Sequence, residues 1–210
     1  MPPRRWPFLA LLAALALPFA AAPLAPARAE TACPDILLGD SLAVGLAPHA
    51  RALGFTVIAQ QGAGIAWLRQ QEPRCARRLI LVFGTNDLRG MTAAEAEAYP
   101  LRIAAVMEAW EAQQAIWATP GCFQDAALER GSAALDAALT RHLRRASDRL
   151  RDLPAIHSGR LARCVYPSHD GIHPTGLGYQ AWWAGLSQWL ERAAVAGLQP
   201  ASAQRQSMIR

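Results

Sequence analysis

Two short stretches near opposite ends of the chain carry residue types that together could catalyse acyl transfer. Ser41 lies in Gly-Asp-Ser-Leu, and Asp170 and His173 lie three residues apart in Asp-Gly-Ile-His-Pro. A serine hydroxyl is a weak nucleophile until a base takes its proton, and an imidazole oriented by a carboxylate is such a base. The spacing lets Asp170 reach one ring nitrogen of His173 while the other nitrogen faces a substrate. These residue types are therefore candidates for a Ser-His-Asp triad.

Each of these stretches also has a purely structural explanation. Ser41 follows an apolar run and belongs to a common type of helix N-cap residue. Asp170 can cap the helix that follows it, in which case His173 is incidental. His169 also lies beside Asp170, so the sequence offers two histidines as the base.

Two further stretches between them contain residues that favour tight turns. Gln-Gln-Gly-Ala-Gly contains Gly62 and Gly64, and Gly-Thr-Asn-Asp contains Asn86. The glycines can simply turn the chain, and Asn86 can cap a helix. Asp40 and Asp87 form a second pair of carboxylates, which we interpret as acceptors for amide groups at helix N-termini rather than as an acid and a base.

Strand-like and helix-like segments alternate after residue 34, as in a parallel sheet covered by helices on both faces. We expect strands at 35–38, 55–59, 79–83, 115–118 and 155–157, and helices at 42–53, 65–71, 93–113, 128–151 and 176–194. The predicted fold class is α/β, a three-layer αβα sandwich with a five-stranded parallel sheet. Such sheets bind ligands beyond the carboxyl ends of their strands, so residues that follow strands are the candidates for chemistry.

Together the four stretches resemble the SGNH hydrolase family, also called GDSL esterases and lipases. The resemblance rests on residues 39–42, 60–64, 84–87 and 170–174, which occur in the family's order. It implies a flavodoxin-like SGNH hydrolase fold. It also implies that Ser41 is the nucleophile, that His173 is the general base and then the acid, and that Asp170 orients His173.

The resemblance further implies an oxyanion hole. Its donors are the backbone N–H of Ser41, the backbone N–H of Gly62 and the side-chain amide of Asn86. Gly64 is the alternative to Gly62, because no Asn or Asp precedes the glycine of the second stretch and its register stays open. Trp67 follows these glycines. We expect its side chain either to form the bottom of an acyl or sugar pocket or to pack in the core.

Residues 1–29 are predicted to be a cleaved signal peptide. Arg4 and Arg5 precede an apolar run, and Ala-Arg-Ala at 27–29 has the small residues of a cleavage site. Prolines interrupt the run, which is shorter than the ~20 residues of a membrane-spanning helix. We therefore expect a catalytic domain at 30–196, a flexible tail at 197–210, no stable membrane anchor after cleavage, and a periplasmic or secreted location.

The basic charge of the chain does not point to a nucleic-acid partner. The 210 residues carry a net charge of +5, and loss of residues 1–29 removes three arginines and no acidic residue, which leaves +2. The remaining arginines are scattered rather than gathered with aromatic residues. We expect no nucleic-acid binding.

The four cysteines allow three disulfide pairings. In the expected fold, Cys33 and Cys75 both precede neighbouring strands at the amino edge of the sheet. Cys122 and Cys164 both lie in loops at the opposite edge. We therefore expect the pairs Cys33–Cys75 and Cys122–Cys164, in keeping with an oxidising compartment.

The leading functional hypothesis is an exported serine esterase that hydrolyses O-acyl esters through an acyl-enzyme, a reaction class that the family resemblance supplies. The short chain leaves no room for a large lid, which favours acetyl-type esters of a small molecule or a glycan. A lysophospholipase or thioesterase and an O-acyltransferase acting on envelope glycans are alternatives. The non-enzyme alternative is an inactive carbohydrate-binding envelope domain. We expect a monomer without a cofactor or a metal.

Overall fold

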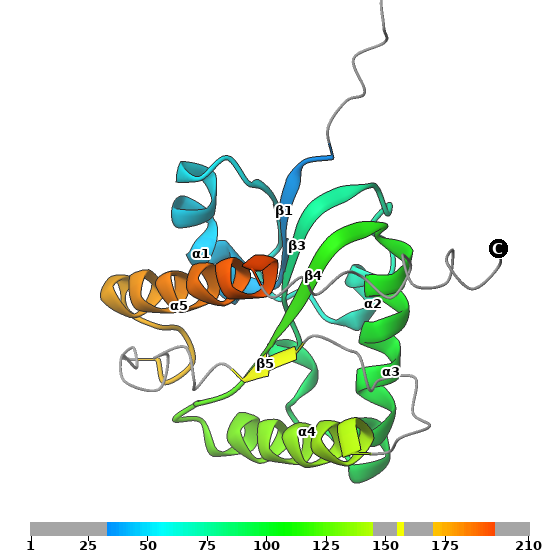
Figure 1. Ribbon diagram of the computed structural model, residues 1–210. Helices are drawn as coiled ribbons and strands as arrows, with labels where there is room; N and C mark the ends of the chain where they lie inside the picture. The colour runs from blue at the N-terminus through cyan, green and yellow to red at the C-terminus, as the bar shows by residue number, and fades with distance from the viewer. Residues whose placement is uncertain (1–32, 145–154, 158–169, 196–210) are drawn as a thin grey trace, which may run out of the picture. The chain divides into compact units, whose positions relative to one another are not determined.

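A five-stranded parallel sheet with the order β2-β1-β3-β4-β5 underlies the fold. Figure 1 shows the central strands β1, β3 and β4 side by side. The computed structural model describes residues 33–144, 155–157 and 170–195, so the expected signal peptide and tail lie outside the described residues. The strands are β1 (Asp35–Gly39), β2 (Thr56–Ala59), β3 (Ala76–Val82), β4 (Ala112–Thr119) and β5 (Ala155–His157). Every neighbouring pair is parallel, so the carboxyl ends of the strands share one edge.

Helices cover both faces of the sheet and complete the three expected layers. They are α1 (Ser41–Ala52), α2 (Ile65–Leu68), α3 (Ala93–Ala109), α4 (Ala126–Arg144) and α5 (Gly176–Val195), with a short 3₁₀ helix at Thr85–Asp87. Side chains of α1 and α5 pack on one face, and those of α2, α3 and α4 pack on the other. The predicted fold class is confirmed. Within the described ranges, no helix combines the length and the apolar composition needed to cross a membrane.

The buried parts of the central strands are mostly apolar because helices cover both faces of the sheet there. In β1, Ile36 and Leu38 pack with residues of α3 and α4, whereas Leu37 between them packs with residues of α1 and α5. All three side chains are fully buried. A sheet covered in this way leaves its carboxyl edge as the place where side chains can meet a ligand.

The helix expected at 93–113 is shorter than its sequence pattern indicates. Thr92 caps its start by accepting a hydrogen bond from Glu95 N at 3.2 Å, in a capping box. The helix ends at Ala109, and the fully buried Trp110 follows as its C-cap. β4 therefore begins at Ala112 rather than at 115. Its first residues include polar glutamines, which a search for apolar runs does not detect.

β3 likewise begins at Ala76 rather than at 79. The prediction began too late because two of the first three residues of the strand are charged. Arg77 and Arg78 both bond to the carboxylate of Asp35 on the neighbouring strand. Burial by itself raises the pKa of Asp35, but hydrogen bonds and positive charges from both arginines outweigh it and lower that pKa overall. α2 is also shorter than expected and ends at Leu68.

The amino edge of the sheet carries the expected disulfide between Cys33 and Cys75. Their Cα atoms lie 5.3 Å apart, just ahead of β1 and β3. These strands are neighbours, which explains how two cysteines 42 residues apart meet. Cys122 is also disulfide-bonded, and its expected partner Cys164 lies outside the described residues.

Candidate active site

Ser41 is the first residue of α1 and follows β1 after a single intervening residue, Asp40. The N-cap is Asp40 rather than Ser41, because Asp40 Oδ1 accepts a hydrogen bond from Leu42 N at 2.9 Å. The hydroxyl of Ser41 is thereby left for another partner. The interpretation of Ser41 as a simple cap is wrong, and the expected role of Asp40 at a helix N-terminus is confirmed.

Asp40 also ties α1 to the turn after β3. Its Oδ2 accepts hydrogen bonds from Gly84 N at 3.2 Å and from Thr85 N at 3.0 Å, and the whole residue is buried. A buried carboxylate is stable only when several donors compensate its lost hydration, and three backbone amides do so here. The start of α1 and the Gly-Thr-Asn-Asp turn are therefore fixed relative to each other.

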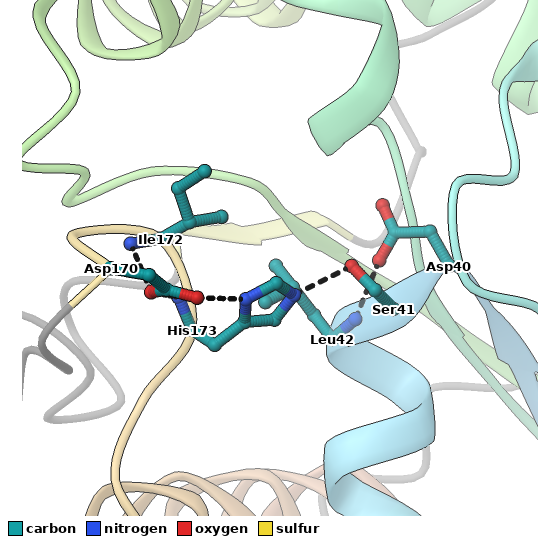
Figure 2. A network of polar contacts seen from close by, with 6 residues as sticks. All are labelled: Asp40, Ser41, Leu42, Asp170, Ile172 and His173. Atoms are coloured by element: carbon teal, nitrogen blue, oxygen red, sulfur yellow. Dashed lines mark hydrogen bonds and ion pairs between the residues drawn. The ribbon is translucent and has the colours of Figure 1, made fainter.

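His173 lies between Ser41 and Asp170, although Ser41 comes from the start of the chain and the other two precede α5 (Figure 2). The distance from His173 Nε2 to Ser41 Oγ is 2.9 Å, and the distance from Nδ1 to Asp170 Oδ2 is 2.7 Å. With a proton on Nδ1, the ring donates to Asp170 and accepts from the Ser41 hydroxyl. The structure brings together the three residues of the predicted triad, while His169 lies outside the described residues.

The carboxylate of Asp170 is held by its own loop. Its Oδ1 accepts hydrogen bonds from Ile172 N and His173 N, each at 2.9 Å, which leaves Oδ2 for the imidazole (Figure 2). This local turn fixes the orientation of the carboxylate before α5 begins. The side chains of His173 and Asp170 are 37% and 39% exposed, so this end of the site is open to solvent.

Asn86 lies in the 3₁₀ helix after β3 and holds the loop that contains the candidate oxyanion glycines. Its Nδ2 donates a hydrogen bond to Ala63 O at 2.9 Å. A carboxamide has two N–H donors, and this bond engages one of them. The other is available to an oxygen of a substrate.

Gly62 and Gly64 need to be glycine for different reasons. Gly62 has a φ of +71°, which side chains rarely adopt, although open space surrounds it. At Gly64 a Cβ atom would lie 2.9 Å from Asp87 Oδ1, so the carboxylate occupies the space of a side chain. Both glycines stay candidates for the backbone donor.

Asp87 anchors the start of α2 below these glycines. Ile65 N donates to both carboxylate oxygens of Asp87 at 3.1 Å, as expected for an acceptor at a helix N-terminus. Tyr99 Oη donates to Asp87 Oδ2 at 2.7 Å. Burial and the charge of Asp87 raise the pKa of Tyr99 well above its usual value, so the phenol keeps its proton and remains a donor. Sequence reasoning missed Tyr99, because nothing in its local pattern distinguishes it from a core aromatic residue of α3.

Trp67 contributes to the core as well as to the surface near α2. Its ring stacks on that of Phe83 with 6.4 Å between centroids and an interplanar angle of 13°, and the side chain is half-buried. A surface groove of about 450 Å³ lies farther along α2 and α3, lined among others by Leu68, Leu101 and Trp110. None of the triad residues lines this groove.

The arrangement offers acid, base and nucleophilic groups rather than a metal-binding set. Over residues 33–144, 155–157 and 170–195, no three His, Cys, Asp or Glu side chains gather closely enough to hold a metal ion. A hydroxyl hydrogen-bonded to an imidazole, next to amide donors that follow neighbouring strands, is suited to attack on a carbonyl carbon.

Comparison with known proteins shows which solved structures have a similar fold. No protein-family model and no curated protein matches the chain. Among solved structures, it is similar to a GDSL-like lipase from Bacteroides thetaiotaomicron, with a TM-score of 0.57 and 16% identity over 75% of this chain and 87% of the lipase.

Two other similar structures belong to proteins named for acetyl chemistry on carbohydrates. One is a carbohydrate acetylesterase family member from Sinorhizobium meliloti, with a TM-score of 0.50 and 15% identity over 76% of this chain and 98% of that one. The other is the C-terminal catalytic domain of peptidoglycan O-acetyltransferase A from Streptococcus pneumoniae. Its TM-score is 0.52, with 14% identity over 80% of this chain and 96% of that domain. At such identities the likeness establishes the fold, which is that of the GDSL-like lipases and acylhydrolases.

Proposed function

We propose that this chain, which has the fold of the GDSL-like lipases and acylhydrolases, is an exported serine esterase of the SGNH type. It hydrolyses short O-acyl esters through an acyl-enzyme. The observation that carries the proposal is the continuous hydrogen-bonded path from Ser41 Oγ through His173 to Asp170, with distances of 2.9 and 2.7 Å. A serine, a histidine and an aspartate linked in this order are the parts that activate a hydroxyl nucleophile.

Acylation begins when His173 Nε2 takes the proton of Ser41 and Oγ attacks the ester carbonyl carbon. The imidazolium that forms is stabilised by Asp170, whose Oδ2 already accepts from Nδ1. When the tetrahedral intermediate collapses, its bond to the alcohol oxygen breaks and Nε2 returns the proton to the departing alcohol. The acyl group then remains on Ser41.

Deacylation repeats these steps with water. Nε2 removes a proton from the attacking water, the carbonyl carbon becomes tetrahedral again, and the bond to Ser41 Oγ breaks as Oγ regains a proton from His173. The exposure of the His173 and Asp170 side chains gives water direct access to this end of the site. An open site therefore favours hydrolysis of the acyl-enzyme.

Negative charge on the carbonyl oxygen is stabilised by Ser41 N–H, a glycine N–H from residues 62–64 and Asn86 Nδ2. Asn86→Ala is expected to lower kcat by about 100-fold, since one well-aimed donor to an oxyanion contributes about 3 kcal/mol. Steady-state hydrolysis of p-nitrophenyl acetate measures the effect. Gln70→Ala, which shortens another exposed amide, is the control and should leave kcat unchanged. An Asn86→Ala enzyme as active as Gln70→Ala would contradict this role.

Acetyl-type esters of a glycan are the substrate class that we propose. The open end of the triad can accept a bulky alcohol such as a sugar polymer. The groove beside α2 and α3 is not lined by triad residues, so it gives no continuous channel from Ser41 for a long acyl chain. The carbohydrate acetylesterase of the same fold supports this choice. The Cys33–Cys75 disulfide supports export to an oxidising compartment, where we propose that the enzyme acts as a monomer.

Acyl transfer to a glycan hydroxyl is the second candidate function. It is favoured by the shared fold with the catalytic domain of a peptidoglycan O-acetyltransferase. The two reactions share the acyl-enzyme and differ in whether water or a sugar hydroxyl attacks it. Adding a soluble acceptor glycan to the assay distinguishes them, because a transferase forms acylated glycan at the expense of free acid.

A panel of p-nitrophenyl esters from acetate to palmitate, with fluorophosphonate labelling, tests the proposed function. We expect the purified mature protein to be labelled and to be most active on acetate or butyrate. A maximum at octanoate or longer would exclude an acetylesterase and favour a lysophospholipase or thioesterase. A protein that neither reacts with the probe nor hydrolyses any ester would be a binding domain instead.

A further inference from the structure

α1, which begins at Ser41, and α5, which follows His173, are in close contact at Gly45. Ser41 begins α1, and His173 lies just ahead of α5. One turn after Ser41, Gly45 faces the ring of Tyr179 in the first turn of α5. A Cβ atom added to Gly45 would lie 1.9 Å from Tyr179 Cζ and 2.3 Å from its Oη, where no side chain fits.

The Tyr179 ring is half-buried, and Trp182 limits its movement toward the core. It stacks on Trp182 with 6.4 Å between centroids and an interplanar angle of 18°, and Trp182 is fully buried in the core shared by α1 and α5. Close-packed interiors transmit such a displacement rather than absorb it. A larger residue at position 45 must therefore displace this ring or separate α5 from α1.

His173 is linked to this contact through a short, hydrogen-bonded segment of chain. Thr175 caps α5, since its Oγ1 accepts from Gly178 N at 3.2 Å and its carbonyl accepts from Tyr179 N at 2.9 Å. Only Pro174, which is buried and has a fixed φ, lies between the cap and His173. A shift of the first turn of α5 therefore moves the imidazole.

We propose that Gly45 and Tyr179 are positioning residues whose contact sets the distance between Ser41 Oγ and His173 Nε2. The proposal rests on the proposed esterase function, because it assigns these residues to the same triad. The contact acts on one link only. The Asp170–His173 bond is formed within its own loop, and Asn86 is held from the opposite side of the sheet by Ala63.

Separating α1 from α5 should therefore lower kcat and leave KM unchanged. The 2.9 Å bond between Nε2 and Oγ is the one that a shift breaks, and a misplacement of about 1 Å between reacting groups can cost about 100-fold in rate. A change from glycine to alanine also favours the helical state of α1, so weakening of the helix does not explain a loss of activity.

The experiment compares Gly45→Ala, Tyr179→Ala and the double variant, with p-nitrophenyl acetate as substrate. We expect Gly45→Ala to lower kcat by about 100-fold at an unchanged KM. We expect the double variant to recover much of this loss, because removing the ring makes space for the added methyl group. Gly176→Ala is the matched control, since a Cβ there meets open space, and it should keep wild-type kcat.

The outcomes separate this proposal from the proposed function. An inactive, unlabelled wild-type protein would remove the esterase assignment. An active wild type together with an unchanged kcat in Gly45→Ala would overturn only the positioning role. A double variant whose kcat stays as low as that of Gly45→Ala would overturn it as well. If Gly45→Ala does not fold, the double variant decides: folded and active supports the spacing contact, and unfolded or inactive overturns it.

Discussion

Ser41→Ala and His173→Ala are each expected to lower kcat for p-nitrophenyl acetate by about 10⁴- to 10⁶-fold, and the double variant is expected to be no slower than either one. Without Oγ no acyl-enzyme forms, and without the imidazole nothing removes the Oγ proton. The two residues act as one unit across the 2.9 Å bond, so the second loss adds nothing. Single-turnover and steady-state assays measure this non-additivity.

Fluorophosphonate labelling adds a check that does not depend on the ester chosen. The probe should modify wild type, fail completely on Ser41→Ala and react very slowly with His173→Ala. Additive losses in the double variant would mean that Ser41 and His173 act independently. Full labelling of Ser41→Ala would mean that another nucleophile carries the reaction. Unfolding is excluded as an explanation when circular dichroism and melting temperature match wild type.

Asp170→Asn is expected to lower kcat by about 10³- to 10⁴-fold while KM changes little. The amide oxygen can still accept from Ile172 N and His173 N, so the loop keeps its shape. The amide nitrogen of Asn, however, replaces Asp170 Oδ2 beside Nδ1. It is a hydrogen-bond donor, whereas Oδ2 is an acceptor. The ring then carries its proton on Nε2 and cannot accept one from Ser41.

Steady-state kinetics with p-nitrophenyl acetate measures the Asp170→Asn effect. Glu191→Gln, the same change of chemistry at an exposed position of α5, is the control and should leave kcat unchanged. The side chain of Asp170 is 39% exposed, so water is the competing partner for Nδ1. An Asp170→Asn enzyme within a few-fold of wild type would mean that water replaces Asp170 and that this carboxylate only shapes the turn.

The layers of the fold follow from local sequence pattern. Strand segments with two buried faces are apolar at consecutive positions, as in 36–38, and helices between them show one apolar face. These patterns depend on residues a few positions apart, which is why element order and fold class could be predicted. The errors in strand boundaries fall where a strand is polar. Arg77 and Arg78 belong to β3 because they pair with Asp35 on the neighbouring strand, and a local pattern does not show that pairing.

The sequence by itself determined the parts of the site that fit within a few residues. Asp170 and His173 are three residues apart, so one turn brings carboxylate and imidazole together, and Asp40 caps α1 by accepting from Leu42 N, two residues along the chain. The resemblance to a known family assigned roles to these residues. The parallel arrangement of the strands placed the loops that carry them at the carboxyl edge of the sheet.

Only the tertiary structure decided the contacts between segments far apart in the chain. The Ser41–His173 bond spans 132 residues, Tyr99 reaches Asp87 from another helix, and Gly45 meets Tyr179 with no space for a methyl group. Such distances depend on how whole helices pack on the sheet, and a fraction of an ångström decides them. Residue types and spacing name the reacting groups, whereas packing sets how closely they meet.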